Sequence, residues 1–88
     1  MLTMLKHTDP GHGWLQVPGV LLREVTSADK VSGCSYYHAA TDTFFLEEDG
    51  DAALVTGPLR EAGYKLSFEV SYEEDTFVRK LPHWEGGA

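Results

Sequence analysis

The chain has 88 residues, of which 42% are hydrophobic and 24% are charged. This length and composition are typical of one globular domain spanning residues 1–88, and they exclude a disordered chain. Fourteen acidic residues against seven basic ones give a formal net charge of −7, which argues against nucleic acid or an anionic membrane as a partner and favours a basic protein.

The single cysteine, Cys34, excludes an intramolecular disulfide and favours a reducing, intracellular setting. The first residues contain no apolar run of signal-peptide length, and no stretch is long and apolar enough to span a membrane. An unpaired thiol near a sheet edge could meet its counterpart in a second copy, so an intermolecular disulfide and a homodimer stay open. On a strand, Cys34 and His38 would lie roughly 13 Å apart, which is too far for a nucleophile and its base.

The N-terminal part is predicted to be a loose loop followed by a short strand. Residues 1–13 include a proline and two glycines within four positions, which is typical of a turn-rich segment. Trp14–Val17 then reads as a strand. Pro18 either begins a type II turn of a hairpin or sits in the first turn of a helix that ends near Ser27. The helix fits better, because apolar residues recur at every fourth position.

The middle of the chain is predicted to form a hairpin and a second helix. Cys34–Ala39 and Thr43–Glu48 alternate as two strands joined by a short polar turn. The acidic residues that follow can cap a helix that runs to about Ala62 and stops at Gly63. Pro58 inside that helix predicts a kink or two short helices, because proline removes one backbone hydrogen bond.

Tyr64–Glu73 shows the strongest periodicity in the chain and predicts one long strand. Its apolar side, expected to be buried, consists of Tyr64, Leu66, Phe68, Val70 and Tyr72. Its polar side consists of Lys65, Ser67, Glu69, Ser71 and Glu73. Thr76–Leu81 is predicted as a short final strand or an extended tail, and residues 82–88 as a loose terminus.

The predicted order is strand, helix, strand, strand, helix, strand, which indicates a small α+β domain. It is the order of the ferredoxin-like fold, in which two helices cover one face of an antiparallel sheet. Another small α+β fold with an N-terminal hairpin is the alternative.

No motif predicts an enzyme, a cofactor or a metal site. His7, Asp9 and His12 offer three potential metal ligands at close spacing, but a fourth ligand is missing, and a polar loop is the favoured explanation. Glu47–Asp51 resembles a calcium loop only superficially. With Gly50 at the sixth position, Phe45 would stand where a carboxylate is required and Thr56 where a glutamate is required.

Acidic residues concentrate in two windows that contain no Lys or Arg. The first window holds Asp42, Glu47, Glu48, Asp49 and Asp51, and the second holds Glu69, Glu73, Glu74 and Asp75. Carboxylates on one face of a strand recur about every 6.6 Å and could imitate a nucleic-acid backbone for a basic groove. A solvated acidic surface without a partner is the alternative interpretation.

Three segments resemble successive pieces of a family of small acidic proteins found in phages, plasmids and other mobile elements. They are His12–Pro18, Ala28–Ser32 and Phe45–Ala52, and the resemblance spans roughly residues 9–72. It implies a helix after Pro18 and no catalytic residue. Small, acidic mobile-element proteins are in turn similar to anti-CRISPR inhibitors, several of which block the nucleic-acid channel of a Cascade-type complex.

Charge and resemblance together predict a phage-derived inhibitor that acts in the cytoplasm of a bacterial host. It would bind a basic nucleic-acid groove of a Cascade-type complex through the acidic residues of both windows, with Tyr37 as a central anchor. The alternative is a non-enzymatic phage accessory module that associates with itself or with another protein through a sheet edge.

Overall fold

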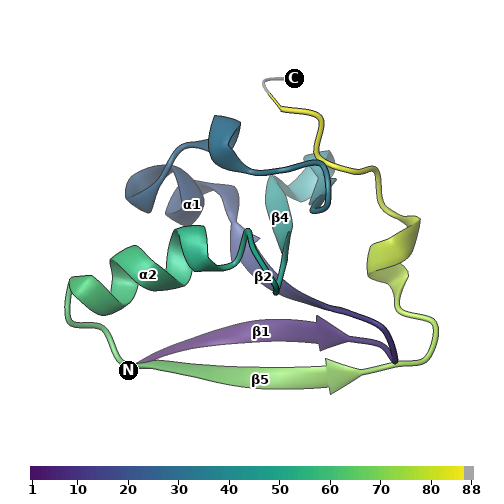
Figure 1. The fold of residues 1–88 in the computed structure, drawn as a ribbon, viewed down its shortest axis with the longest axis horizontal. Coiled ribbons are helices and arrows are strands. Elements are labelled where there is room, and N and C mark those ends of the chain that lie inside the picture. Colours follow the sequence, from purple (N-terminus) through teal and green to yellow (C-terminus); the bar gives the residue numbers. More distant parts are fainter. Residues whose placement is uncertain (87–88) are drawn as a thin grey trace.

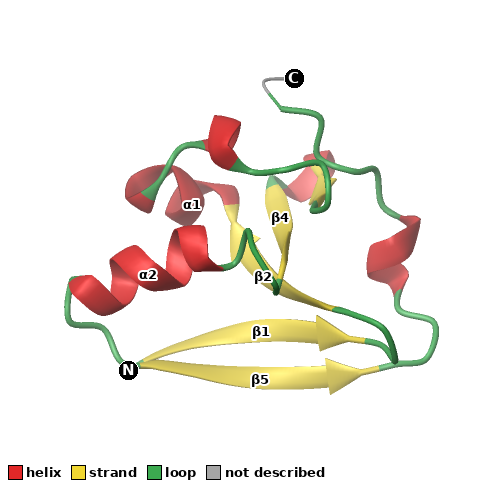
Figure 2. Ribbon diagram, viewed as in Figure 1, coloured by secondary structure: helices red, strands yellow, loops and turns green. Residues whose placement is uncertain are grey.

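The structure is a computed structural model that describes residues 1–86. A five-stranded mixed sheet with strand order β3-β4-β2-β1-β5 carries two α-helices, which confirms the predicted small α+β class (Figures 1 and 2). The elements in chain order are β1 (Leu2–Thr8), β2 (Gly13–Pro18), α1 (Gly19–Val25), β3 (Tyr36–His38), β4 (Thr43–Glu47), α2 (Ala53–Glu61) and β5 (Leu66–Tyr72), with a 3₁₀ turn, η3 (Phe77–Lys80), near the C-terminus.

The prediction of a loose N-terminus was wrong, because Leu2–Thr8 forms strand β1 near the middle of the sheet. β1 pairs antiparallel with β2 from Leu5 to Thr8, and parallel with β5 along its whole length. The two remaining strand pairs, β2–β4 and β3–β4, are antiparallel. The ferredoxin-like expectation of an antiparallel sheet therefore fails at the β1–β5 pair, which Figure 1 shows as two arrows running side by side.

Both helices occur where the sequence predicts them. α1 begins directly after Pro18, which supports the helix over the hairpin turn. α2 runs as one helix through Pro58 and ends before Gly63, whose φ of 96° is the left-handed conformation that glycine adopts without strain.

The main core lies between the sheet and the two helices, on the side called here the helix face. It contains Met4, Leu15, Val17, Leu22, Val31, Phe44, Leu46, Val55, Leu59 and Trp84. The side chains of alternate residues in β1, β2 and β4 supply this layer, as the two-residue period of a strand requires.

On its second face the sheet is partly covered, over β2, β3 and β4, by the C-terminal segment rather than by a helix layer. Val78 is fully buried there against Trp14, Tyr36 and Phe45. The chain then reaches the β3 edge, where Tyr36 pairs with His83 and Trp84 enters the main core. The prediction that the chain is loose from Pro82 onward was therefore wrong for 82–84, and residues 87–88 lie outside the described part.

Candidate functional site

Asp42, an acidic residue of the first window, is already paired inside the molecule. Its carboxylate accepts hydrogen bonds from Arg23 at 2.7 and 3.1 Å and from the Tyr37 hydroxyl at 2.7 Å. These donors hold the pKa of Asp42 below its usual value, with Arg23 contributing most. Tyr37, predicted as an interface anchor, is half-buried and points its hydroxyl at this pair.

Asp51 and Glu48 are also satisfied internally. Asp51 is 8% exposed, and one of its oxygens accepts hydrogen bonds from the Ser32 amide, the Ser32 hydroxyl and the Ser35 hydroxyl. The prediction of Asp51 as a partner contact is corrected, because a buried carboxylate with three donors has a structural role. Glu48 forms an ion pair with Lys6 at 2.6 Å.

Five predicted contact residues keep their carboxylates free of an ion pair within residues 1–86. They are Glu47 and Asp49 from the first window, and Glu69, Glu73 and Glu74 from the second. Asp75 lies 3.7 Å from Lys80 in a solvent-exposed pair, which contributes little attraction.

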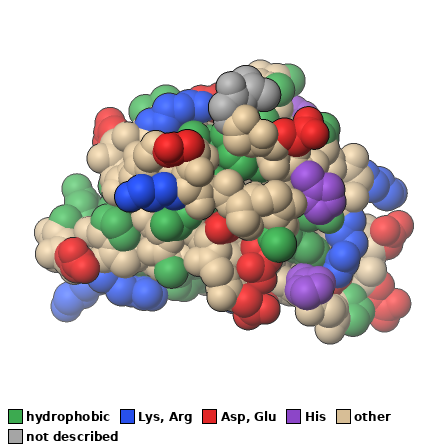
Figure 3. Space-filling model, turned by 45° about the horizontal axis from the view of Figure 1, so that its top comes forward, with side chains coloured by type: hydrophobic (Ala, Val, Ile, Leu, Met, Phe, Trp, Pro, Cys, Tyr) green, Lys and Arg blue, Asp and Glu red, His purple; other side chains and the backbone are tan. Residues whose placement is uncertain are grey.

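The two windows do not merge into one acidic row. Glu47 lies opposite Trp14 on the second face, whereas its neighbour Glu48 turns to the helix face. Glu47 and Glu69 share the second face, but β2 and β1 lie between their strands, a separation of about 14 Å. Arg79 lies over Trp14 in that interval, with its guanidinium 5.0 Å from the ring centre. Acidic and basic side chains are likewise interspersed on the face shown in Figure 3.

The apolar side of β5 is exposed, which corrects the prediction that it is buried. Its exposed fractions are 38% at Phe68, 61% at Val70 and 59% at Tyr72, and Tyr64 before the strand is 54% exposed. Leu66 alone packs against the main core. Large apolar side chains gathered in one row are typical of an interaction surface.

The same residues also offer unpaired backbone groups, because β5 is an edge strand. The Lys65 carbonyl accepts from the Leu2 amide and the Glu73 amide donates to the Thr8 carbonyl, so the odd-numbered residues bond to β1. Since successive residues of a strand point their backbone groups to opposite sides, those of Leu66, Phe68, Val70 and Tyr72 face outward.

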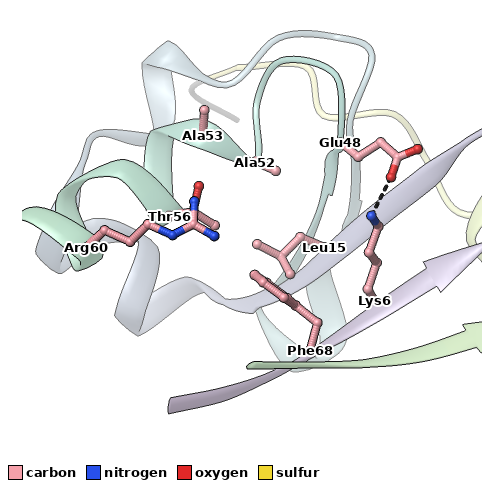
Figure 4. A pocket seen from close by; sticks show the side chains of 8 residues that line it. All are labelled: Lys6, Leu15, Glu48, Ala52, Ala53, Thr56, Arg60 and Phe68. Carbon is pink, nitrogen blue, oxygen red and sulfur yellow. Dashed lines mark ion pairs between the residues drawn. The ribbon is translucent and has the colours of Figure 1, made fainter. Parts of the chain in front are cut away.

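A cavity of about 210 Å³ opens beside this edge, between α2 and the strands. Phe68 and Leu15 form its apolar floor, and Thr56 and Arg60 of α2 line the opposite wall (Figure 4). The Lys6–Glu48 ion pair closes one end. An apolar side chain of a strand added to β5 could lie against Phe68 at this opening.

The three potential metal ligands near the N-terminus are not brought together. The Asp9 carboxylate forms an ion pair with Arg79 and accepts from the Gly11 and His12 amides at 2.9 and 2.8 Å. Arg79 first, and then the amides, hold the pKa of Asp9 well below its usual range. His7 lies on the second face, where its Nε2 is 2.7 Å from the Gln16 side-chain oxygen.

Cys34 is exposed in the turn before β3 and lines a second cavity, of about 340 Å³. An exposed thiol is accessible to a second copy, so the intermolecular disulfide stays a prediction.

Comparison with protein-family models, with curated proteins and with solved structures found no match to this chain. The resemblance to mobile-element proteins therefore stays a prediction. Among residues 1–86, no helix is long and apolar enough to cross a membrane.

Proposed function

We propose that the chain is a non-enzymatic interaction module that binds an extended segment of a basic partner protein along the open edge of β5. The observation that carries this proposal is the coincidence of two features in the same residues. Phe68, Val70 and Tyr72 expose apolar side chains and also direct unpaired backbone groups to the open edge. Addition of a strand would satisfy these backbone groups while the apolar row provides contact area.

The charges around the edge support a basic partner. Glu69 lies on the strand, and Glu73 and Glu74 follow it directly, all three exposed and without an ion pair in the described part of the chain. A partner strand carrying Lys or Arg would pair with these carboxylates on one face and place apolar residues beside Phe68 on the other.

The same charges disfavour a second copy as the occupant. In an antiparallel pair of β5 strands centred on the middle of Leu66–Tyr72, Glu69 would face Glu69 of the other copy. Two chains of net charge −7 also repel each other before they meet.

The first prediction concerns the peptides that β5 selects. From a displayed library of random peptides, the chain is expected to enrich sequences in which apolar and basic residues alternate. Val70→Lys should weaken binding of such a peptide about tenfold or more, because it places a positive charge, which repels the basic peptide, at the centre of the site. Val20→Lys is the matched control, since Val20 is similarly exposed, at 68% against 61% for Val70, but lies on α1.

NMR titration with an enriched peptide locates the site. Amide shifts and new exchange protection should concentrate on the outward amides of β5. The proposal would be refuted if peptide binding left the amide signals of β5 unshifted. It would also be refuted if Val70→Lys and Val20→Lys lowered the peptide affinity equally. Dimerisation that Val70→Lys abolishes would instead assign the edge to a second copy.

A second, narrower proposal is that the basic partner is the nucleic-acid groove of a host Cascade-type complex, with the chain acting as an inhibitor. The favouring observation is that Glu69 and Glu73 remain exposed and unpaired within residues 1–86. Attraction of this kind would speed association and would be screened by salt.

The inhibitor proposal predicts that the purified chain reduces target-DNA binding by a Cascade complex. Reversal of Glu69 and Glu73 to lysine should abolish this inhibition. Reversal of Glu24 and Glu85, two exposed acids elsewhere, changes the net charge equally and should leave most of it intact. An equal loss of inhibition in both double variants would show that only the net charge matters. An absence of inhibition by the unaltered chain would end the proposal.

A further inference from the structure

His12 comes together with two carboxylates that the sequence does not place beside it. A His12 ring nitrogen, a Glu47 oxygen and an Asp49 oxygen all lie within 4.8 Å of one another. His12 belongs to the loop between β1 and β2, Glu47 ends β4, and Asp49 lies in the turn before α2. The β2–β4 register brings these loops to the same end of the sheet, because Trp14 pairs with Glu47.

We propose that His12, Glu47 and Asp49 form a binding site for a divalent transition-metal ion of the zinc type. One imidazole nitrogen with two carboxylate oxygens is a donor set that zinc accepts, whereas magnesium and calcium prefer oxygen ligands alone. Neither Glu47 nor Asp49 has an ion-pair partner among residues 1–86, so a cation would relieve the repulsion between two neighbouring carboxylates.

The backbone that carries these ligands is held in place. The Asp9 carboxylate accepts from the His12 amide at 2.8 Å and is itself fixed by Arg79. The Asp49 amide donates to Glu47 Oε1 at 3.0 Å, which leaves the other Glu47 oxygen for an ion. Ligand atoms around tetrahedral zinc lie roughly 3.4 Å apart, so rotation of the exposed His12 and Asp49 side chains closes the site.

The surroundings leave a coordination position open. His12 and Glu47 both line the cavity of about 340 Å³ on the second face, so an ion held by them lies at its rim. Cys34 and His83 line the same cavity. A water molecule or a small anion entering the cavity can therefore supply the fourth ligand.

The test uses the full chain carrying Cys34→Ser, so that the exposed thiol does not itself bind the probe. Calorimetric titration with zinc chloride should give one saturable site. His12→Ala and Asp49→Ala should each weaken binding at least tenfold. His38→Ala serves as the matched control, since His38 lies at the β3 end of the sheet, and should change the affinity less than twofold.

A second measurement locates the ion independently of affinity. Cobalt(II) should broaden the amide signals of Gly13 and Glu48, which neighbour the ligands in sequence, before those of β5. Three results would each overturn the proposal: zinc affinity unchanged by His12→Ala, displacement of zinc by millimolar magnesium, or the absence of a saturable zinc site. The first two indicate non-specific attraction of cations to the acidic surface, and the third indicates no zinc binding.

Discussion

Replacement of Trp84 by alanine is expected to lower the free energy of unfolding by about 3–5 kcal/mol. Trp84 is 6% exposed and contacts the rings of Tyr37 and Phe44, with centre-to-centre distances of 4.9 and 4.8 Å. Its indole Nε1 donates to the Ala28 carbonyl at 3.1 Å. A loss of this size is a large share of the stability of a small domain, which is about 5–15 kcal/mol in total.

Two further variants separate the contributions of Trp84. Trp84→Phe keeps an aromatic ring but removes the hydrogen bond to Ala28, so it should lower the free energy of unfolding by less, about 2 kcal/mol. Glu85→Ala, one residue further on and exposed, should leave stability within about 0.5 kcal/mol of the original chain. Urea denaturation with linear extrapolation measures all three. A change below about 1 kcal/mol in Trp84→Ala would mean that the tail is loose in solution, as the sequence alone suggests.

The order of strand β1 and of the C-terminal segment around Trp84 is not predicted from the sequence, for the same physical reason in both cases. Both are held by contacts with residues far away in the sequence. β1 gains its order from a parallel partner, β5, more than sixty residues later, and Trp84 is anchored by Ser35 and Ala28. The turn formers Pro10, Gly11 and Gly13 follow β1 directly, and Pro82 stands just before Trp84. Neither segment shows a strong periodicity, so local propensity favours a loop in both places. Elements with local signals, such as α1 after Pro18 and the stop of α2 before Gly63, were predicted from those signals.

The prediction that the apolar side of β5 is buried was wrong, although the alternation of apolar and polar residues correctly predicts a strand. Periodicity shows that one side of a strand is apolar, but not how much of that side a helix covers. α2 has nine residues and is about 13.5 Å long, whereas the seven residues of β5 extend about 23 Å. Leu66 packs against the main core, to which α2 contributes Val55 and Leu59, whereas Val70 and Tyr72 remain exposed.

The acidic windows were visible in the sequence, but the internal pairing of their members was not. Lys6 reaches Glu48 only because β1 lies in the sheet, and Arg23 reaches Asp42 across nineteen positions of sequence. The separation of Glu47 from Glu48 could have been predicted, since adjacent residues of a strand point to opposite faces. His12 was recognised as a potential ligand, yet Glu47 and Asp49 meet it only through strand pairing.

The second large effect is expected at Asp51, where alanine should cost about 2–4 kcal/mol of unfolding free energy. The carboxylate joins the Ser32–Ser35 turn to the start of α2 through three hydrogen bonds of 3.0, 2.7 and 2.5 Å. The Ser35 hydroxyl is fully buried and also accepts from the Glu47 amide at 3.0 Å, which extends the network to the end of β4. Removal of the carboxylate leaves a buried donor without a partner, and this desolvation penalty exceeds the value of an ordinary hydrogen bond.

Two further variants, Asp51→Asn and Asp49→Ala, test whether the loss of stability is specific to the Asp51 carboxylate. Asp51→Asn keeps an oxygen that can accept from the same donors, so its loss should be clearly smaller than that of Asp51→Ala. Asp49→Ala removes an exposed carboxylate two positions away and should change stability by less than about 0.5 kcal/mol in metal-free buffer. Equal stability of the two alanine variants would contradict a structural role for Asp51 and return it to the solvent-exposed acids. The expected contrast divides the first acidic window into a carboxylate that maintains the fold and one that remains available to a ligand.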